Sequence, residues 1–237
     1  MNVLTPAPPT ALSTGLEVQS DRAGTLTSRM SAGGPLGPAR SLVEFSRLIS
    51  PGFRPHSAAT GEGWFVKGVL PGEAKVTVSA GGWDGRTDNP GVVPAADPVL
   101  RSASEITFGN DAVASTVDRQ ADTRFYGDGR VEAAAGSHRL SARAYGERNR
   151  TDARYGSWLG LNEITADATQ RLIGGAELQD TLATGWPGAV EVTAGGGWRQ
   201  EHVVADEQTE DRGGTELSAL PRAHVWMSTW SGFVESA

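Results

Sequence analysis

Hydrophobic and charged side chains alternate with a period of two along residues 124–147, RFYGDGRVEAAAGSHRLSARAYGE. On both sides of a short turn at 135–138, every second residue is apolar or glycine, and the residues between them repeatedly carry full charges. Such alternation over about ten residues predicts a β-strand with one face in apolar surroundings and the other in water. The segment therefore predicts a hairpin of two long strands with one apolar and one ionic face.

The same two-strand unit recurs along the chain. Besides the two strands of 124–147, we expect strands at 16–20, 24–32, 40–49, 63–70, 74–83, 169–182, 189–204 and 222–234. Short turns at 33–39, 71–73, 135–138 and 183–188 alternate with long loops at 50–62, 84–123, 149–168 and 205–221. Short turns on one side of a sheet and long loops on the other are typical of bacterial outer-membrane barrels.

These features predict an all-β fold, an antiparallel transmembrane β-barrel built as a meander of hairpins. We expect a partial barrel of about 9–10 strands. Residues 1–14, rich in Pro, Thr and Ala, are predicted to form an irregular N-terminal segment, and residues 15–237 to form the barrel segment.

The alternation also assigns the two faces of the wall, because a barrel separates lipid from a watery lumen. The lipid face is expected to hold Val131, Ala133, Leu140, Ala142, Val190 and Val192, and the lumen face Arg130, Glu132, Arg143 and Glu191. The remaining charges of the central hairpin either guide a substrate or pair across strands and hydrate the wall, and we favour pairing.

Composition excludes several classes of function. The formal net charge is −7 and no basic stripe occurs, which argues against a nucleic-acid partner. The chain has no Cys, so it has no disulfide framework and no Cys-ligated metal. No apolar run reaches the roughly 18 residues of a transmembrane helix, and MNVLTPAPPTALSTG is not a signal peptide. An exported form of the chain is expected to lack its leader.

No catalytic motif occurs, so we expect neither an enzyme nor a cofactor. The four histidines are scattered and fit no metal-ligand spacing. The acidic run Asp206, Glu207, Glu210 and Asp211 is interpreted as a solvated loop instead of a divalent-cation site, because it has no EF-hand spacing. No metal site is therefore predicted.

One cluster in or beside the loop 149–168 is the candidate for contact with an external ligand. It consists of Arg148, Arg150, Arg154, Tyr155 and Trp158. Guanidinium groups bind carboxylates in a bidentate geometry, and aromatic rings offer a stacking surface. A solvated basic loop without a ligand is the competing interpretation.

From about Thr14 onward the chain resembles the barrel of a TonB-dependent outer-membrane receptor. The resemblance rests on an early hairpin ending in PGFRPHS, on GWFVKGVL–PGE–AKVTVSAGGWDG, and on a loop that begins DNPGVVPAADP. Nothing resembles the plug domain or the energy-coupling segment before it, and the chain ends FVESA without a terminal aromatic residue. The resemblance therefore implies the N-terminal part of such a barrel, with its plug absent.

The resemblance also implies a function. We expect part of an outer-membrane receptor for energy-coupled uptake of a scarce nutrient, such as a ferric chelate (siderophore). Its expected partners are outer-membrane lipid, a small-molecule ligand such as a metal chelate, and an energy-coupling inner-membrane complex only if a plug is supplied elsewhere. Two alternatives remain open: a complete small barrel of about eight to ten strands acting as an adhesin, anchor or surface enzyme, and a soluble periplasmic β-sandwich that binds a ligand.

Overall fold

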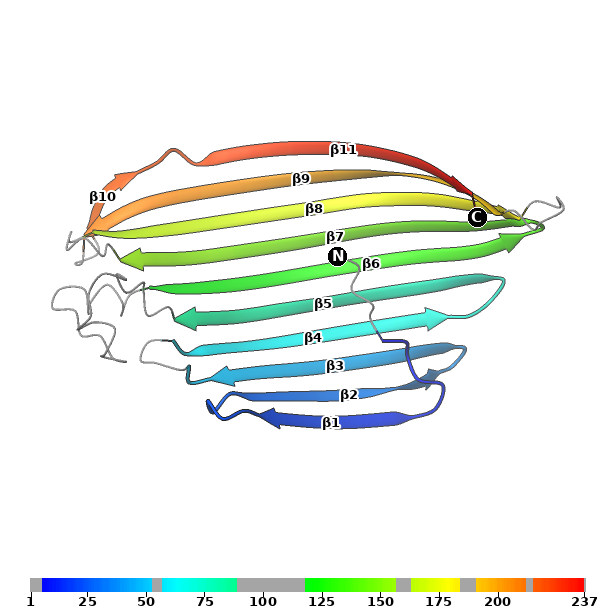
Figure 1. The fold of residues 1–237 in the computed structure, drawn as a ribbon, viewed down its shortest axis with the longest axis horizontal. Coiled ribbons are helices and arrows are strands. Elements are labelled where there is room, and N and C mark those ends of the chain that lie inside the picture. The colour runs from blue at the N-terminus through cyan, green and yellow to red at the C-terminus, as the bar shows by residue number, and fades with distance from the viewer. Residues whose placement is uncertain are drawn as a thin grey trace.

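The chain folds into one antiparallel sheet (Figure 1). The computed structural model describes residues 6–52, 57–88, 118–156, 163–183, 191–211 and 215–236, and these ranges contain no helix. The strands are β1 (Ser13–Ser20), β2 (Leu26–Leu36), β3 (Ala39–Ser50), β4 (Ala59–Leu70), β5 (Ala74–Asp88), β6 (Arg119–Ala135), β7 (His138–Gly156), β8 (Glu163–Ala183), β9 (Glu191–Asp211), β10 (Glu216–Ala219) and β11 (Ala223–Ser236). The predicted all-β meander is confirmed.

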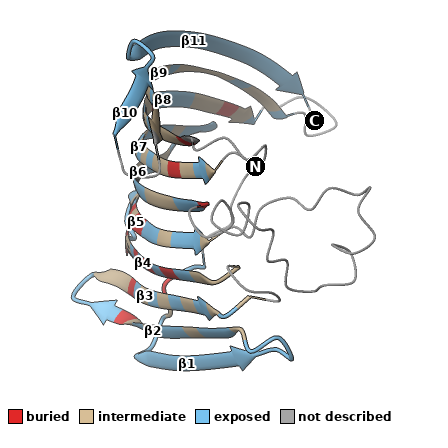
Figure 2. Cartoon of the chain, turned by 90° about the vertical axis from the view of Figure 1, so that its left-hand side faces the viewer, coloured by how far each residue is buried: buried red, intermediate tan, exposed pale blue. Residues whose placement is uncertain are grey.

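Each strand pairs with its neighbour in sequence from β1 to β9. β10 and β11 then pair with successive parts of β9, so together they form one interrupted edge strand. Within the described residues, β1 and β11 do not pair with each other, and seen along the strands the sheet is an open arc (Figure 2). This result overturns the alternative of a closed small barrel for the described part of the chain. A β-sandwich is overturned too, because every described strand belongs to the same sheet.

At one end of the sheet, here called the turn end, the hairpins close tightly. Two residues connect β2 to β3 and two connect β6 to β7. The first residue of each connection is a glycine with positive φ, 59° at Gly37 and 63° at Gly136. Two-residue hairpin turns require this left-handed conformation, which glycine adopts without steric cost. At the opposite end, the long-connection end, β5 ends at Asp88 and β6 begins at Arg119.

The two faces of the arc differ in chemistry as the alternation predicts. The convex face carries an apolar band that runs across the strands and includes Leu16, Met30, Phe45, Trp64, Val66, Val78, Val131, Ala133, Leu140, Ala142, Leu172, Leu178 and Val192. Arg130, Glu132, Arg143 and Glu191 lie on the concave face. Every predicted face assignment among the described residues is confirmed, and Val190 lies outside them.

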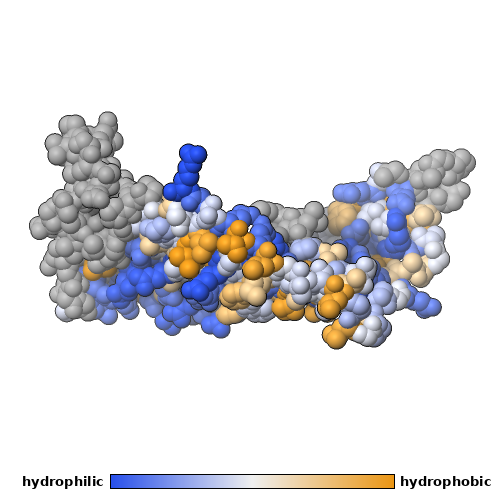
Figure 3. Space-filling view, turned by 90° about the horizontal axis from the view of Figure 1, so that it is seen from below, coloured by the Kyte–Doolittle hydropathy of each residue, from blue (hydrophilic) through white to orange (hydrophobic). Residues whose placement is uncertain are grey.

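Burial follows the same division. On β4 the odd-numbered residues are mostly buried, whereas most of the even-numbered ones, Trp64 and Val66 among them, are exposed. Seen from the β1 side, hydrophobic side chains gather over the middle of the strands and hydrophilic ones dominate toward the long-connection end (Figure 3). A sheet with its large apolar side chains on the exposed face is inverted relative to a soluble protein and suits lipid surroundings.

Aromatic rings on the concave face fill the space above glycines of the neighbouring strand. Trp83 of β5 covers Gly61 of β4, and Tyr126 of β6 covers Gly81 of β5. Tyr145 of β7 covers Gly175 of β8 in the same way. Each glycine lacks the Cβ that would collide with the ring, so the glycines allow bulky rings to lie flat against the wall.

The strands are longer than the sequence predicts, and the loop limits were wrong for this reason. β7 continues to Gly156 and β8 begins at Glu163, so most of the predicted loop 149–168 is strand. Parts of the predicted loops 84–123 and 205–221 are also strand. They belong to β5 and β6 in the first loop and to β9 and β10 in the second. At the turn end, β2 extends to Leu36 through the glycines of the predicted turn 33–39. The hydrophobic pattern fades where both faces become polar, although the backbone ladder continues.

The glycine–aromatic packing predicts unequal effects of two matched substitutions on β4. Gly61→Ala should lower the free energy of unfolding by about 1–3 kcal/mol, because its Cβ overlaps the ring of Trp83. Gly68→Ala meets nothing within 4 Å and should leave stability unchanged or raise it by up to about 1 kcal/mol. Denaturant titration in detergent micelles, followed by tryptophan fluorescence, measures both. Equal losses at the two positions would contradict the packing.

Candidate functional site

The concave face of the sheet is lined by ion pairs that cross from strand to strand. Arg143 of β7 contacts Asp128 of β6 on one side and Glu177 of β8 on the other, the latter at 3.5 Å. Further along the sheet, Glu201 of β9 is buried and receives both Arg171 of β8 and Arg199 of β9. The arginines thus join neighbouring strands on the concave face.

Other pairs extend this lining across the arc. They are Arg29–Glu44 at 2.6 Å, Lys75–Glu132 at 2.7 Å, Arg124–Glu147 at 2.8 Å and Arg139–Glu191 at 2.6 Å. The predicted pairing of the concave charges is therefore confirmed. Most of these side chains are partly exposed, so each pair adds little stability by itself. Their collective effect is a hydrated, ordered wall suited to a water-filled lumen.

The structure divides the candidate ligand residues between the two faces. Arg148, Arg150 and Arg154 lie on β7 and not in a loop, and the register places all three on the convex face. Tyr155 is on the same strand and shares the concave face with Ala153. Trp158 lies outside the described residues. The predicted loop position of Arg150, Arg154 and Tyr155 was wrong, because β7 continues past the end of its apolar stretch.

The three convex arginines have different partners. Arg150 binds Asp152 at 2.7 Å. Arg154 lies 3.8 Å from Glu210 of β9, which is a long ion pair. For Arg148, the described part of the chain provides no ion-pair partner. The three arginines therefore do lie together on one face of β7, but this is the convex face, away from the concave side of the arc.

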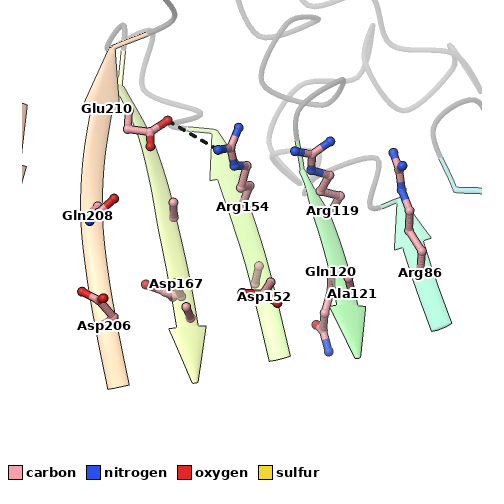
Figure 4. Close-up of a pocket in the computed structure, with 13 residues that line it drawn as sticks. Arg86, Arg119, Gln120, Ala121, Asp152, Arg154, Asp167, Asp206, Gln208 and Glu210 are labelled. Atoms are coloured by element: carbon pink, nitrogen blue, oxygen red, sulfur yellow. Dashed lines mark ion pairs between the residues drawn. The ribbon is translucent and has the colours of Figure 1, made fainter. Parts of the chain in front are cut away.

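A shallow hollow of about 400 Å³ lies on the convex face near the long-connection end, across β5 to β9 (Figure 4). Arg86, Arg119 and Arg154 line one part of it, and the carboxylates of Asp206 and Glu210 line another. Figure 4 shows the side chains of Arg119 and Arg154 side by side. The hollow has polar walls and is open to the outside of the arc, so it is separate from the lumen.

Metal binding finds no support in the described residues, which contain no group of three or more potential His, Cys, Asp or Glu ligands. The acidic run is divided by the strand alternation, since Asp206 and Glu210 face the convex side and Glu207 the concave side. The side chain of Asp211 is not described. Among the described residues there is likewise no helix long and apolar enough to cross a membrane.

One aromatic cluster on the convex face is not evident from the sequence pattern. His202 of β9 stacks on Trp226 of β11 with a centroid distance of 3.8 Å, and its ring lies 5.6 Å from that of His224. Trp198 and Trp230 meet nearby at 6.2 Å. Period-two positions alone could have placed these rings on one face of each strand, but their contact depends on the register between β9 and β11.

Comparison with known proteins gives matches only at the level of three-dimensional structure. No family model and no curated protein sequence matches the chain. Among solved structures, the unliganded ferric citrate transporter FecA has a TM-score of 0.74 and 15% identity, covering 98% of this chain and 39% of that chain. FpvA of P. aeruginosa, bound to heterologous pyoverdines, has a TM-score of 0.78 and 11% identity, with 98% and 35% covered. The ferric yersiniabactin uptake receptor FyuA from Yersinia pestis has a TM-score of 0.66 and 10% identity, with 98% and 45% covered.

These neighbours are receptors and transporters, not enzymes, and they belong to the TonB-dependent class that the sequence resembles. The chain spans less than half the length of each of the three solved chains. TM-scores of 0.66–0.78 establish a shared fold, whereas identities of only 10–15% say nothing of ligand or partners. The expected resemblance is confirmed at this level: the chain has the fold of part of the β-barrel wall of TonB-dependent outer-membrane receptors.

Proposed function

We propose that the chain forms part of the wall of an outer-membrane receptor that takes up a scarce nutrient such as a ferric chelate. One observation carries the proposal: an open arc of strands with an apolar convex band and an ion-paired concave face matches receptor barrels over nearly its whole length. An adhesin or anchor that forms a closed barrel would need the two edges to pair, and in the described residues they do not.

The location that suits this architecture is the outer membrane. Every backbone polar group inside a bilayer must be paired, so the free edges of β1 and β11 require further strands. Receptors of the matched class have many-stranded, plugged barrels. In this scheme the wall itself is passive, and energy from an inner-membrane complex acts through a plug supplied outside these residues.

The proposed lumen contact for a ligand is Tyr155. It is the member of the candidate cluster whose side chain shares the concave face, and it lies near the long-connection end, where a ligand would arrive. Several other concave charges, among them Arg124, Arg143 and Arg171, are engaged in cross-strand pairs. An exposed aromatic ring therefore offers the available stacking surface on this part of β7.

Lipid contact of the convex band can be tested with two adjacent, nearly isosteric positions on β5. Val78→Lys should cost about 2–4 kcal/mol in lipid vesicles, because a charge near the bilayer midplane loses its hydration. Val78 is 56% exposed and lies between two glycines, so the longer side chain meets no steric obstacle. Thr77→Lys, on the concave face, should cost far less. Unfolding midpoints in vesicles measure both, and equal costs would contradict lipid contact.

Nutrient uptake can be tested in cells of the native organism. Deletion of the gene that encodes this chain should abolish accumulation of iron-55 from one class of ferric chelate, and complementation should restore it. Collapse of the proton-motive force should have the same effect as deletion if transport is energy-coupled. Unchanged uptake of all ferric chelates tested in the deletion strain would refute the iron-uptake proposal.

Ligand contact at Tyr155 can be tested by titration of tryptophan fluorescence with the ferric chelate that the uptake assay identifies. Tyr155→Ser should weaken binding about fivefold through loss of one aromatic contact. Arg150→Gln is the matched control on the same strand, since Arg150 faces outward and is already bound to Asp152. Equal weakening by both variants, or none by Tyr155→Ser, would refute the contact.

A further inference from the structure

Tyr155 differs from the other two tyrosines of the chain in how its side chain is held. Tyr126 and Tyr145 each cover a glycine of the neighbouring strand, and an arginine lies over each ring, 5.8 Å and 5.0 Å from the ring centroid. In the described part of the chain, Tyr155 has no such glycine beneath it and no ring or cation–π contact. The residue is 40% exposed. The direction of this side chain therefore depends mainly on the backbone that carries it.

That backbone lies where β7 loses one of its two neighbouring strands. The pairing of β7 with β6 ends at Arg154, opposite Arg119, whereas its pairing with β8 continues through Tyr155 to Gly156. Gly156 is the last residue of β7, and glycine has more backbone freedom than any other residue. A strand end that is paired on one side only opens more easily than the middle of a sheet. Tyr155 would lie on such an end if nothing replaced the missing strand.

A side chain takes the place of the missing strand. Asp118 precedes β6 by one residue, and its Oδ1 accepts a hydrogen bond from the backbone N–H of Gly156. A carboxylate acceptor makes a stronger hydrogen bond than a neutral one. Asp118 is only 8% exposed, so water competes little for this oxygen. The bond extends the contact between the two strands to the residue that directly follows Tyr155.

We propose that Asp118 is a positioning residue for the ligand contact at Tyr155. Its carboxylate fixes the end of β7 and thereby directs the tyrosine ring toward the ligand, which Asp118 itself does not touch. The inference rests on the ligand contact proposed above for Tyr155. It goes beyond that contact by giving a role to a buried carboxylate that the ion pairs of the concave face do not use.

The position of Tyr155 can be followed without a ligand, by fluorine NMR of the full chain labelled with fluorotyrosine in detergent micelles. The chain has three tyrosines, and the signal that Tyr155→Phe removes identifies Tyr155. Asp118→Ala should shift and narrow this signal, and hydrogen exchange at the Gly156 amide should become at least about tenfold faster. The signals of Tyr126 and Tyr145 should not move, because the glycines beneath their rings are unchanged.

Two further variants separate the hydrogen bond from the charge and from the loss of a carboxylate as such. Asp118→Asn keeps an oxygen that accepts from Gly156, so it should retain the Tyr155 signal and the slow exchange of the unchanged chain. Asp122→Ala is the matched control, because it removes a carboxylate of β6 that accepts a hydrogen bond from the side chain of Thr151 instead of from the backbone. This control should leave both measurements unchanged.

The consequence for binding is measured with the ferric chelate that the deletion strain fails to accumulate. Asp118→Ala should weaken binding about fivefold, as Tyr155→Ser does. The double variant should bind no more weakly than either single variant, because both changes remove the same contact. Asp118→Asn and Asp122→Ala should each bind within about twofold of the unchanged chain.

The outcomes that overturn the positioning role differ from those that overturn the ligand contact. An unmoved Tyr155 signal in Asp118→Ala, additive losses in the double variant, or equal weakening by Asp118→Asn would overturn the positioning role. If Asp118→Ala releases Tyr155 but neither this variant nor Tyr155→Ser alters binding, the ligand contact itself is wrong. Circular dichroism checks the strand content of each variant. Asp118→Ser, whose side chain is too short to reach Gly156, replaces Asp118→Ala if that variant does not fold.

Discussion

The ladder of backbone hydrogen bonds from β1 to β10 and β11 is the constraint on which the remaining structure depends. It forces successive side chains to opposite faces, so a period-two sequence becomes a wall with two chemistries. On the convex side the wall exposes large apolar residues, and on the concave side it holds cross-strand ion pairs. If the register of a strand slipped by one residue, each of its side chains would move to the opposite face, and its apolar residues would lie on the concave side.

The same ladder leaves backbone hydrogen-bonding groups unpaired at the two edges of the sheet. Each edge strand presents unpaired N–H and C=O groups, and the whole length of β11 is exposed, including Trp230 at 78%. In water such an edge promotes association with other strands, and in lipid its unpaired groups are costly. The interior part of the arc, from β4 to β8, is by contrast paired on both sides and reinforced by rings packed over glycines.

Charge is distributed differently on the two faces of the sheet. On the concave face, Arg124, Arg143 and Arg171 each pair with a carboxylate one strand away, which orders the wall. Convex arginines cluster at one end of β6 and β7, with two of them opposed in register. Carboxylates lie among them, since Asp88 is directly opposite Arg119 and Asp152 binds Arg150.

The sequence by itself determined the hairpins, their order and the face on which each side chain lies, because alternation is a local property of each strand. Val131 and Arg143 were placed correctly for this reason. The tertiary structure alone decided where strands end, since β7 runs to Gly156 through residues that are polar on both faces. It also decided which distant residues meet, such as Arg119 with Arg154 and His202 with Trp226. Such contacts depend on register and on the curvature of the sheet, and both are set by interactions between strands that no single segment encodes.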